Sequence, residues 1–150
     1  MSGITPRRRK ISRYDDYMPM KTAQDSVVLA MDRANGDVRL ITSILEKAGF
    51  QVWTSSEEAN VLSLCHSAEI SVRLVIIDTA APGIHTFELL ESLRQINPGI
   101  GVLLLAGENE PKASYAWTAN VRGQLSRPFR RAHLLGSVLE ATAPTLTRTV

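Results

Sequence analysis

The apolar residues of the chain fall into short runs, and the clearest run leads directly into a carboxylate. Leu74–Ile77 is uninterrupted and apolar, Asp78 follows at once, and a turn with Pro82 and Gly83 comes next. A short apolar run that ends in turn residues is typical of a strand buried on both faces of a parallel sheet. The pattern therefore predicts a central strand with Asp78 at its carboxyl end, where open α/β sheets bind their ligands.

Similar runs recur along the chain, separated by stretches in which apolar residues follow helical spacing. The stretch with Val38, Ile41 and Leu45 is followed by Gly49, a residue typical of the position after a helix. This alternation predicts an α/β fold, a doubly wound five-stranded parallel sheet with five helices on its two faces and right-handed crossovers. The predicted strands are 26–31, 50–53, 74–77, 102–105 and 124–125, and the predicted helices begin near Asn35 or Gly36, Ser55 or Ser56, Thr86, Pro111 and Arg130.

The chain divides into one body and two flanking segments. We expect a single domain over 26–142, a basic and flexible N-terminal arm over 1–25 and a C-terminal tail over 143–150. The whole chain has 17 Lys and Arg against 15 Asp and Glu, whereas the arm alone has six Lys or Arg against three Asp. A basic arm on a nearly neutral body is compatible with an acidic partner.

The composition excludes several classes of protein. No apolar run approaches the roughly 18 to 20 residues of a membrane span, and the basic N-terminus lacks the apolar segment of a secretory signal. Cys65 is the only cysteine, so no internal disulfide forms, and its apolar helical surroundings predict a buried side chain. We therefore expect a cytoplasmic protein without a membrane segment.

The sequence has few residues that could make an enzyme site. No glycine-rich phosphate loop is present, and His66, His85 and His133 are scattered without metal-ligand spacing. One carboxylate at a strand end, with no convergent His or Ser, is too little for a small-molecule reaction. We therefore predict that the protein is not an enzyme with its own substrate.

Residues at the ends of the predicted strands occur in a characteristic order. An acidic residue ends the first strand, an Asp followed by Pro-Gly ends the third, Asn-Pro precedes the fourth, and a basic residue with Pro-Phe follows the fifth. These residues are Asp32, Asp78 with Pro82 and Gly83, Asn97 with Pro98, and Arg127 with Pro128 and Phe129. With this order and spacing, residues 26–142 resemble the receiver domain of bacterial response regulators, the CheY-like fold, which implies the strand order 2-1-3-4-5.

The resemblance implies a phosphorylation site at Asp78. In that family the Asp that ends strand three accepts a phosphoryl group from a histidine kinase or a phosphotransfer protein, while Mg²⁺ and a Lys before Pro neutralise the phosphoryl oxygens. It therefore implies Asp78 as phosphoacceptor, Arg127 as the phosphoryl contact, and a cis bond between Arg127 and Pro128. The implied Mg²⁺ ligands are Asp32, Asp78 and the backbone carbonyl of Ala80.

Four positions depart from the family pattern. Arg33 replaces the second acidic residue of the metal site and Arg127 replaces the Lys, so positive and negative charges nearly balance and Mg²⁺ binding should be weak or absent. Ala106 stands where the family has a hydroxyl that contacts the phosphoryl group, and Gln124 stands where it has an aromatic switch residue. The usual coupling between phosphorylation and a bistable element is therefore missing.

The usual partner surface of the family lies on the fourth helix, the fifth strand and the fifth helix. Here that surface would carry Tyr115, Trp117, Phe129 and His133, and aromatic residues are typical interface anchors. It is a candidate surface for a homodimer or another partner protein; alternatively, Trp117 is a core residue on a short helix. DNA binding is not expected, because no helix-turn-helix segment follows the body.

Two functions remain open. The first is a stand-alone receiver in two-component signalling, which accepts a phosphoryl group on Asp78 and signals through protein contacts. The second is a pseudo-receiver, the same fold used as an interaction module without phosphorylation, and Arg33, Ala106 and Gln124 favour it. The direction of the Arg33 side chain separates the two: pairing with Asp78 favours the second, whereas pointing to solvent with room for a cation favours the first.

Overall fold

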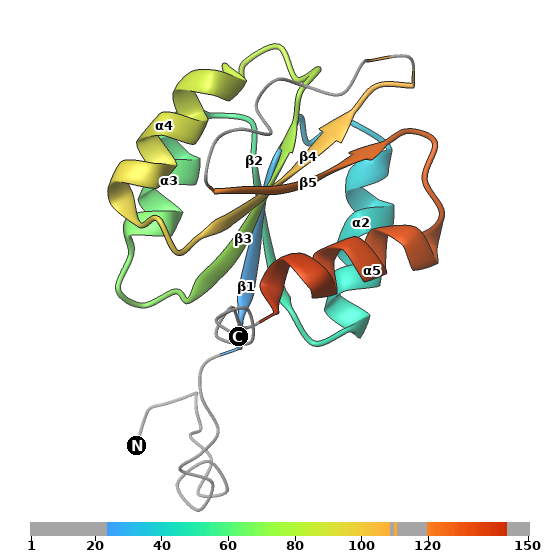
Figure 1. Ribbon diagram of the computed structural model, residues 1–150, viewed down its shortest axis with the longest axis horizontal. Coiled ribbons are helices and arrows are strands. Elements are labelled where there is room, and N and C mark those ends of the chain that lie inside the picture. Colours follow the sequence, from blue (N-terminus) through green and yellow to red (C-terminus); the bar gives the residue numbers. More distant parts are fainter. Residues whose placement is uncertain (1–23, 109, 111–119, 144–150) are drawn as a thin grey trace, which may run out of the picture.

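The chain forms an α/β fold in which five strands alternate with helices (Figure 1). The computed structural model describes residues 24–108, 110 and 120–143. The helix predicted to begin at Pro111 lies outside these residues, as do positions 1–23 of the predicted arm and 144–150 of the predicted tail. The strands are β1 (Ser26–Ala30), β2 (Gln51–Ser55), β3 (Val72–Asp78), β4 (Gly101–Ala106) and β5 (Val121–Ser126), and the described helices are α2 (Asp37–Lys47), α3 (Glu58–His66), α4 (Thr86–Ile96) and α5 (Arg131–Thr142).

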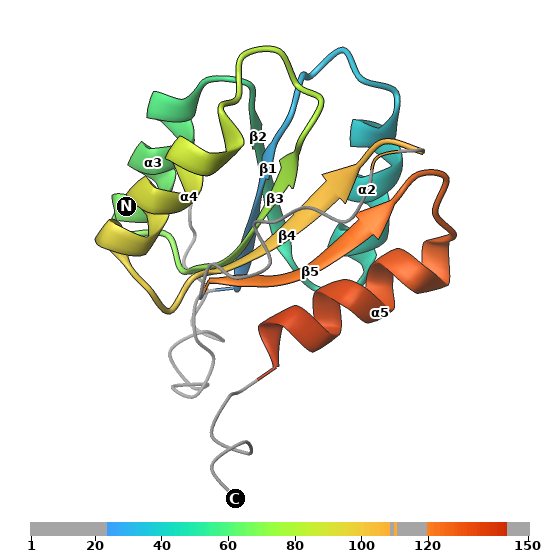
Figure 2. The same cartoon turned by 45° about the horizontal axis from the view of Figure 1, so that its top comes forward.

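The five strands are parallel and lie in the order β2-β1-β3-β4-β5. α2 and α5 cover one face of the sheet, and α3 and α4 cover the other (Figure 2). The predicted doubly wound sheet and its implied strand order are therefore confirmed. None of the described helices is long and apolar enough to cross a membrane.

Each face of the sheet has its own hydrophobic core. In β1, Leu29 belongs to the core beneath α2 and α5, whereas Val28 belongs to the core beneath α3 and α4. Ile76 and Ile77 of β3 alternate in the same way, and all four side chains are fully buried. Because both faces of these central strands are covered, their sequences are continuous apolar runs rather than alternating ones.

The edge strand β5 is longer than its predicted extent of 124–125. It pairs with β4 from Val121 to Ser126, and most of its residues are only partly buried or exposed. The Arg122 guanidinium donates to the carbonyl oxygens of Ala141 (2.6 Å) and Gly99 (3.2 Å), which ties the start of β5 to the end of α5. A partly exposed strand held by such contacts needs few apolar residues, so the apolar pattern alone predicted it too short.

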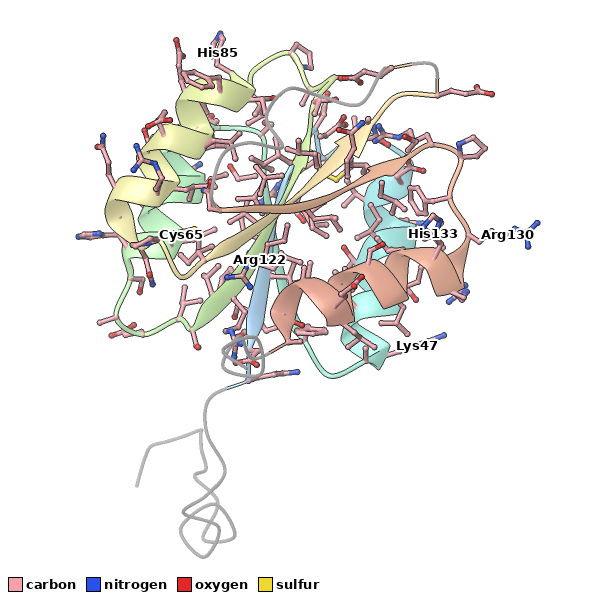
Figure 3. The ribbon with its side chains drawn as sticks, viewed as in Figure 1. Lys47, Cys65, His85, Arg122, Arg130 and His133 are labelled. Atoms are coloured by element: carbon pink, nitrogen blue, oxygen red, sulfur yellow. The ribbon has the colours of Figure 1, made fainter. Side chains whose placement is uncertain are left out.

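Cys65 lies on α3 and packs into the core beneath α3 and α4 (Figure 3). The side chain is buried, as predicted, and burial raises the pKa of the thiol to about 12. The thiolate is the nucleophilic form of cysteine, so very little reactive Cys65 is present at neutral pH.

We expect the native Cys65 thiol to react slowly with Ellman's reagent. A pKa of about 12 lowers the thiolate fraction on the order of a thousandfold relative to an ordinary cysteine, and burial restricts access further. The absorbance of the released chromophore gives the rate in buffer and in denaturant at the same pH. A Ser63→Cys change in a Cys65→Ala background provides an exposed thiol on the same helix, which should react rapidly. If the folded parent and the folded Ser63→Cys, Cys65→Ala variant reacted at comparable rates, the burial of Cys65 would be contradicted.

Candidate functional site

The carboxyl ends of the parallel strands meet along one edge of the sheet. Asp78, the last residue of β3, pairs in register with Leu105 of β4, and Ala106 of β4 pairs with Ser126 of β5. Arg127 follows β5 directly, so it reaches the same edge as Asp78. Only 2% of Asp78 is exposed, and its carboxylate must therefore be stabilised by groups within the protein.

Four contacts surround the Asp78 carboxylate. Oδ1 accepts hydrogen bonds from the Ala80 backbone N–H (3.0 Å) and from Arg127 Nη1 (3.3 Å). Oδ2 accepts from Arg127 Nη2 (3.2 Å) and from Asn35 Nδ2 (3.5 Å). The guanidinium contacts are longer than the roughly 2.7–2.9 Å of strong charge-assisted hydrogen bonds. Both oxygens are therefore occupied, but their contacts with the cation are loose.

The Arg127 guanidinium bridges two carboxylates. Its Nε donates to Asp37 Oδ2 at 2.8 Å, a shorter contact than either of those with Asp78. Burial lowers the pKa of this guanidinium, but the hydrogen bonds to Asp37 and Asp78 and the charges of the two carboxylates outweigh burial and raise the pKa above its ordinary value. Arg127 is therefore a permanent cation that is anchored on Asp37 and faces Asp78.

Sequence reasoning gave Asp37 no role at this site. Asp37 begins α2, and its backbone N–H donates to Asn35 Oδ1 at 2.8 Å, so the turn before the helix is held by a side chain. The amide of the same Asn35 reaches Asp78, which links the start of α2 to the end of β3. An acidic residue in the first turn of the helix that follows β1 was the available signal, because that turn lies at the edge where the strands end.

Arg33 does not pair with Asp78. Its Nε and Nη2 donate to the backbone carbonyl oxygen of Thr54 in β2, at 3.3 and 3.0 Å, and the residue is exposed. The structure therefore lacks the Arg33–Asp78 pair that would have favoured the pseudo-receiver hypothesis. Asp78 pairs with Arg127 instead.

The side chains around Asp78 do not fit a dedicated Mg²⁺ site. Such a site needs several oxygen ligands directed at one point, and within the described part of the chain no group of three acidic, His or Cys side chains could hold a metal ion. Asp32 is exposed, and its Oδ1 accepts the Ala34 N–H at 3.0 Å. The ligand roles implied for Asp32 and for the Ala80 carbonyl stay predictions.

A second polar contact lies at the end of β4. The Thr79 hydroxyl is 2.9 and 3.0 Å from the two carboxylate oxygens of Glu110, and Glu110 Oε1 also accepts the Gly107 N–H at 2.9 Å. Ala106 is fully buried, and its carbonyl accepts the backbone N–H of Arg127 at 3.0 Å. A hydroxyl is thus present near Asp78, but it comes from Thr79 rather than from position 106, and Glu110 binds it. The sequence held no signal for Glu110, because the contact joins two separate loops.

The structure describes part of the predicted partner surface. Phe129 is partly buried against the core beneath α5, and His133 is exposed on α5 (Figure 3). Gln124, the predicted switch position, lies in β5 beside β4. Tyr115 and Trp117 lie outside the described residues, so their place on a surface or in the core stays a prediction.

The three histidines are exposed and come from three separate elements. His66 ends α3, His133 lies on α5, and His85 precedes α4, where its Nδ1 is 3.2 Å from Glu58 Oε2.

A groove opens beside the guanidinium of Arg127. Its volume is about 270 Å³. Arg127 lines this groove, and the Arg127–Pro128 bond in its wall is cis, as the resemblance implied. The lining residues are Asp37, Leu40, Glu108, Arg127, Pro128 and Phe129.

One protein family matches the chain over most of its length. That family is the response regulator receiver domain, and the match covers residues 28–139. No curated protein matches the chain significantly.

Solved structures of response regulators have the same fold. A response regulator receiver domain protein from Clostridium thermocellum is 22% identical with a TM-score of 0.67, over 79% of this chain and 94% of that one. A putative response regulator from Chloroflexus aurantiacus J-10-fl is 20% identical with a TM-score of 0.68, over 82% and 100%. Full-length FixJ from B. japonicum is 22% identical with a TM-score of 0.65, over 81% of this chain and 58% of FixJ. At these identities the likeness establishes the fold.

We expect Arg127 and Asp78 to be coupled in stability. Arg127→Met leaves a buried carboxylate without its cation, so it should lower the free energy of unfolding by about 3 kcal/mol. In an Asp78→Asn background the same change should cost less, with a coupling energy of about 1–3 kcal/mol. Urea denaturation of the two single variants, the double variant and the parent measures this cycle. The matched cycle of Arg33→Met with Asp78→Asn should be additive, and additivity in the Arg127 cycle would contradict the bridge.

Proposed function

This chain belongs to the response regulator receiver domain family, and on that basis we propose that it acts as a receiver in two-component signal transduction. It accepts a phosphoryl group on Asp78 and passes the signal on through protein contacts in the cytoplasm. The observation that carries the proposal is the placement of Asp78, a carboxylate at the end of the central strand β3 that faces the guanidinium of Arg127.

The phosphoryl donor is a phosphohistidine of a histidine kinase or of a phosphotransfer protein. Asp78 Oδ2 attacks the phosphorus atom, because its two donors are the side chains of Asn35 and Arg127, whereas Oδ1 also accepts the backbone N–H of Ala80. A P–O bond forms as the P–N bond breaks, and the released imidazole nitrogen keeps the electron pair and takes up a proton from water. The product is an acyl phosphate on Asp78.

Arg127 stabilises the charge of the incoming group. Its Nε stays on Asp37 at 2.8 Å, while its two Nη atoms, now 3.2 and 3.3 Å from Asp78, turn to the phosphoryl oxygens. A guanidinium offers several N–H donors in one plane, which suits a phosphoryl group. Asp37 is in this scheme a positioning residue, since it acts through Arg127.

The donor protein approaches along the groove beside Arg127. Leu40, with 38% of its surface exposed, and Phe129 give this groove an apolar wall next to a charged floor. Such a combination suits a partner helix that presents a phosphohistidine among apolar residues. The output surface includes α5, where His133 is exposed, and a second copy of the chain is one candidate occupant.

A pseudo-receiver is the second candidate function, and one observation favours it. Both Asp78 oxygens already accept hydrogen bonds from Arg127, so Asp78 has a cation as its partner without a phosphoryl group. Ala106 and Gln124 add to this, because the hydroxyl and the aromatic ring of the usual switch are both replaced. In this reading the module binds its partner in one fixed conformation.

We expect incubation of the full-length protein with acetyl phosphate or phosphoramidate to form one acyl phosphate, located at Asp78. Intact-mass spectrometry detects the added phosphoryl group, and borohydride trapping followed by peptide mapping assigns it. Asp78→Asn should abolish the adduct, whereas Asp25→Asn, which lies before the amino end of β1, should leave the adduct at Asp78. An unmodified parent protein, or an adduct elsewhere in the chain, would contradict phosphoryl acceptance.

Partner binding by Asp78→Asn decides between the two functions. If Asp78 accepts a phosphoryl group, the parent should change its affinity for a captured partner, or its dimer fraction, after phosphodonor treatment, and Asp78→Asn should not respond. Analytical ultracentrifugation measures the dimer fraction, and circular dichroism confirms that the variant is folded. Equal and donor-independent binding by both proteins would instead support the pseudo-receiver.

A further inference from the structure

We propose that the guanidinium of Arg127 takes the place of a divalent cation in this pocket, so that Mg²⁺ binds beside Asp78 only when Arg127 is removed. The inference concerns ion binding and goes beyond phosphoryl transfer. It therefore stands or falls separately from the phosphorylation of Asp78.

The first support is the geometry of the bridge. Arg127 directs Nε to Asp37 and both Nη atoms to Asp78, so three nitrogen atoms of one planar group contact the two carboxylates at 2.8, 3.3 and 3.2 Å. Only 20% of the Arg127 side chain and 3% of the Asp78 side chain are exposed. A bridge of this kind places a fixed positive charge between two carboxylates, which is what a bound divalent cation would do.

The second support is the balance of charge. Asp37 and Asp78 contribute two negative charges and Arg127 one positive charge, and Arg33, which stands at the second acidic position of the family, is held at Thr54 on β2. Hard divalent cations bind where several anionic oxygens remain unneutralised. With Arg127 in place the two carboxylates retain one negative charge; without it they retain two, together with oxygen lone pairs that the guanidinium now occupies.

The third support is the way in which Arg127 is held. Its backbone N–H donates to the Ala106 carbonyl at the end of β4, and its guanidinium is fastened on Asp37 at the start of α2. β4 thus holds the backbone of Arg127 and α2 holds its side chain, and the guanidinium stays charged because its pKa is raised. Arg127 therefore places a positive charge at a fixed position beside Asp78.

An alternative explanation is that Asp37 merely stabilises the N-terminus of α2, with Arg127 as an incidental partner. An acid in the first turn of a helix is favourable by itself. This reading predicts that the pocket binds divalent cations equally well with or without Arg127, so ion titration of the two proteins separates the explanations.

The test is a titration of the full-length protein with Mg²⁺ and with Mn²⁺ alone, without phosphodonor. Isothermal calorimetry gives the affinity, and Mn²⁺-induced line broadening of the amide signals near Asp78 locates the ion. The parent should show no broadening at millimolar ion, whereas Arg127→Met should bind with at least about a tenfold gain in affinity. Arg33→Met is the matched control, since it removes a nearby arginine outside the bridge, and it should behave as the parent does.

A thermal-unfolding series keeps the inference testable if Arg127→Met folds poorly. Mg²⁺ should raise the unfolding midpoint of Arg127→Met, or restore its folded circular dichroism spectrum, and leave that of the parent unchanged. Site-specific broadening in the parent, an equal gain in Arg33→Met, or an Arg127→Met protein that ignores both ions would each overturn the inference.

Discussion

The interaction on which the functional edge of this protein depends is the bridge between Arg127 and two carboxylates. Moving an isolated carboxylate out of water is strongly unfavourable, so a group as inaccessible as Asp78 needs a cation or several donors close by. Arg127 supplies the cation, and Ala80 and Asn35 supply further donors. Since Arg127 also bonds the main chain of Ala106, the same residue joins the ends of β3 and β4 to the loop that leads into α5.

The bridge relates the unusual residues of the pocket to one another. Once a guanidinium neutralises Asp78, a second acidic residue beside Asp32 is no longer needed to hold an ion. Arg33 can then occupy that position and bind the Thr54 carbonyl on the edge strand β2. The hydroxyl of Thr79 is likewise satisfied within the protein, by the carboxylate of Glu110. The pocket thus keeps the framework of a receiver and fills its polar positions with groups from its own chain.

The contacts that the protein's own side chains make in the pocket limit how a phosphoryl group can shift the conformation. In a two-state switch, a ligand shifts the equilibrium only through contacts that differ between the states. Here the contacts made by Arg127 and Glu110 exist before any ligand arrives, so a phosphoryl group would have to replace them rather than add to them. The contacts of Arg127 with Asp78 are longer than its contact with Asp37. Such a replacement would therefore begin at Asp78.

Much of the fold could be predicted from the sequence, since continuous apolar runs such as Leu74–Ile77 report burial on both faces of a sheet, and apolar helical spacing reports one buried face. The edge strand β5 was predicted too short, because a strand stabilised by contacts such as those of Arg122 carries little apolar signal.

For the site, the sequence by itself determined the position of Asp78 at a strand end, the placement of Arg127 after β5, and the replacement of the usual residues by Arg33, Ala106 and Gln124. It could not determine which arginine neutralises Asp78. That was decided by the tertiary structure, which sends Arg33 to β2 and brings Asp37 to Arg127, 90 residues away in the chain. The physical reason is that an ion pair depends on the distance between two side chains in the folded protein, whereas apolar periodicity is a property of neighbouring positions in the sequence.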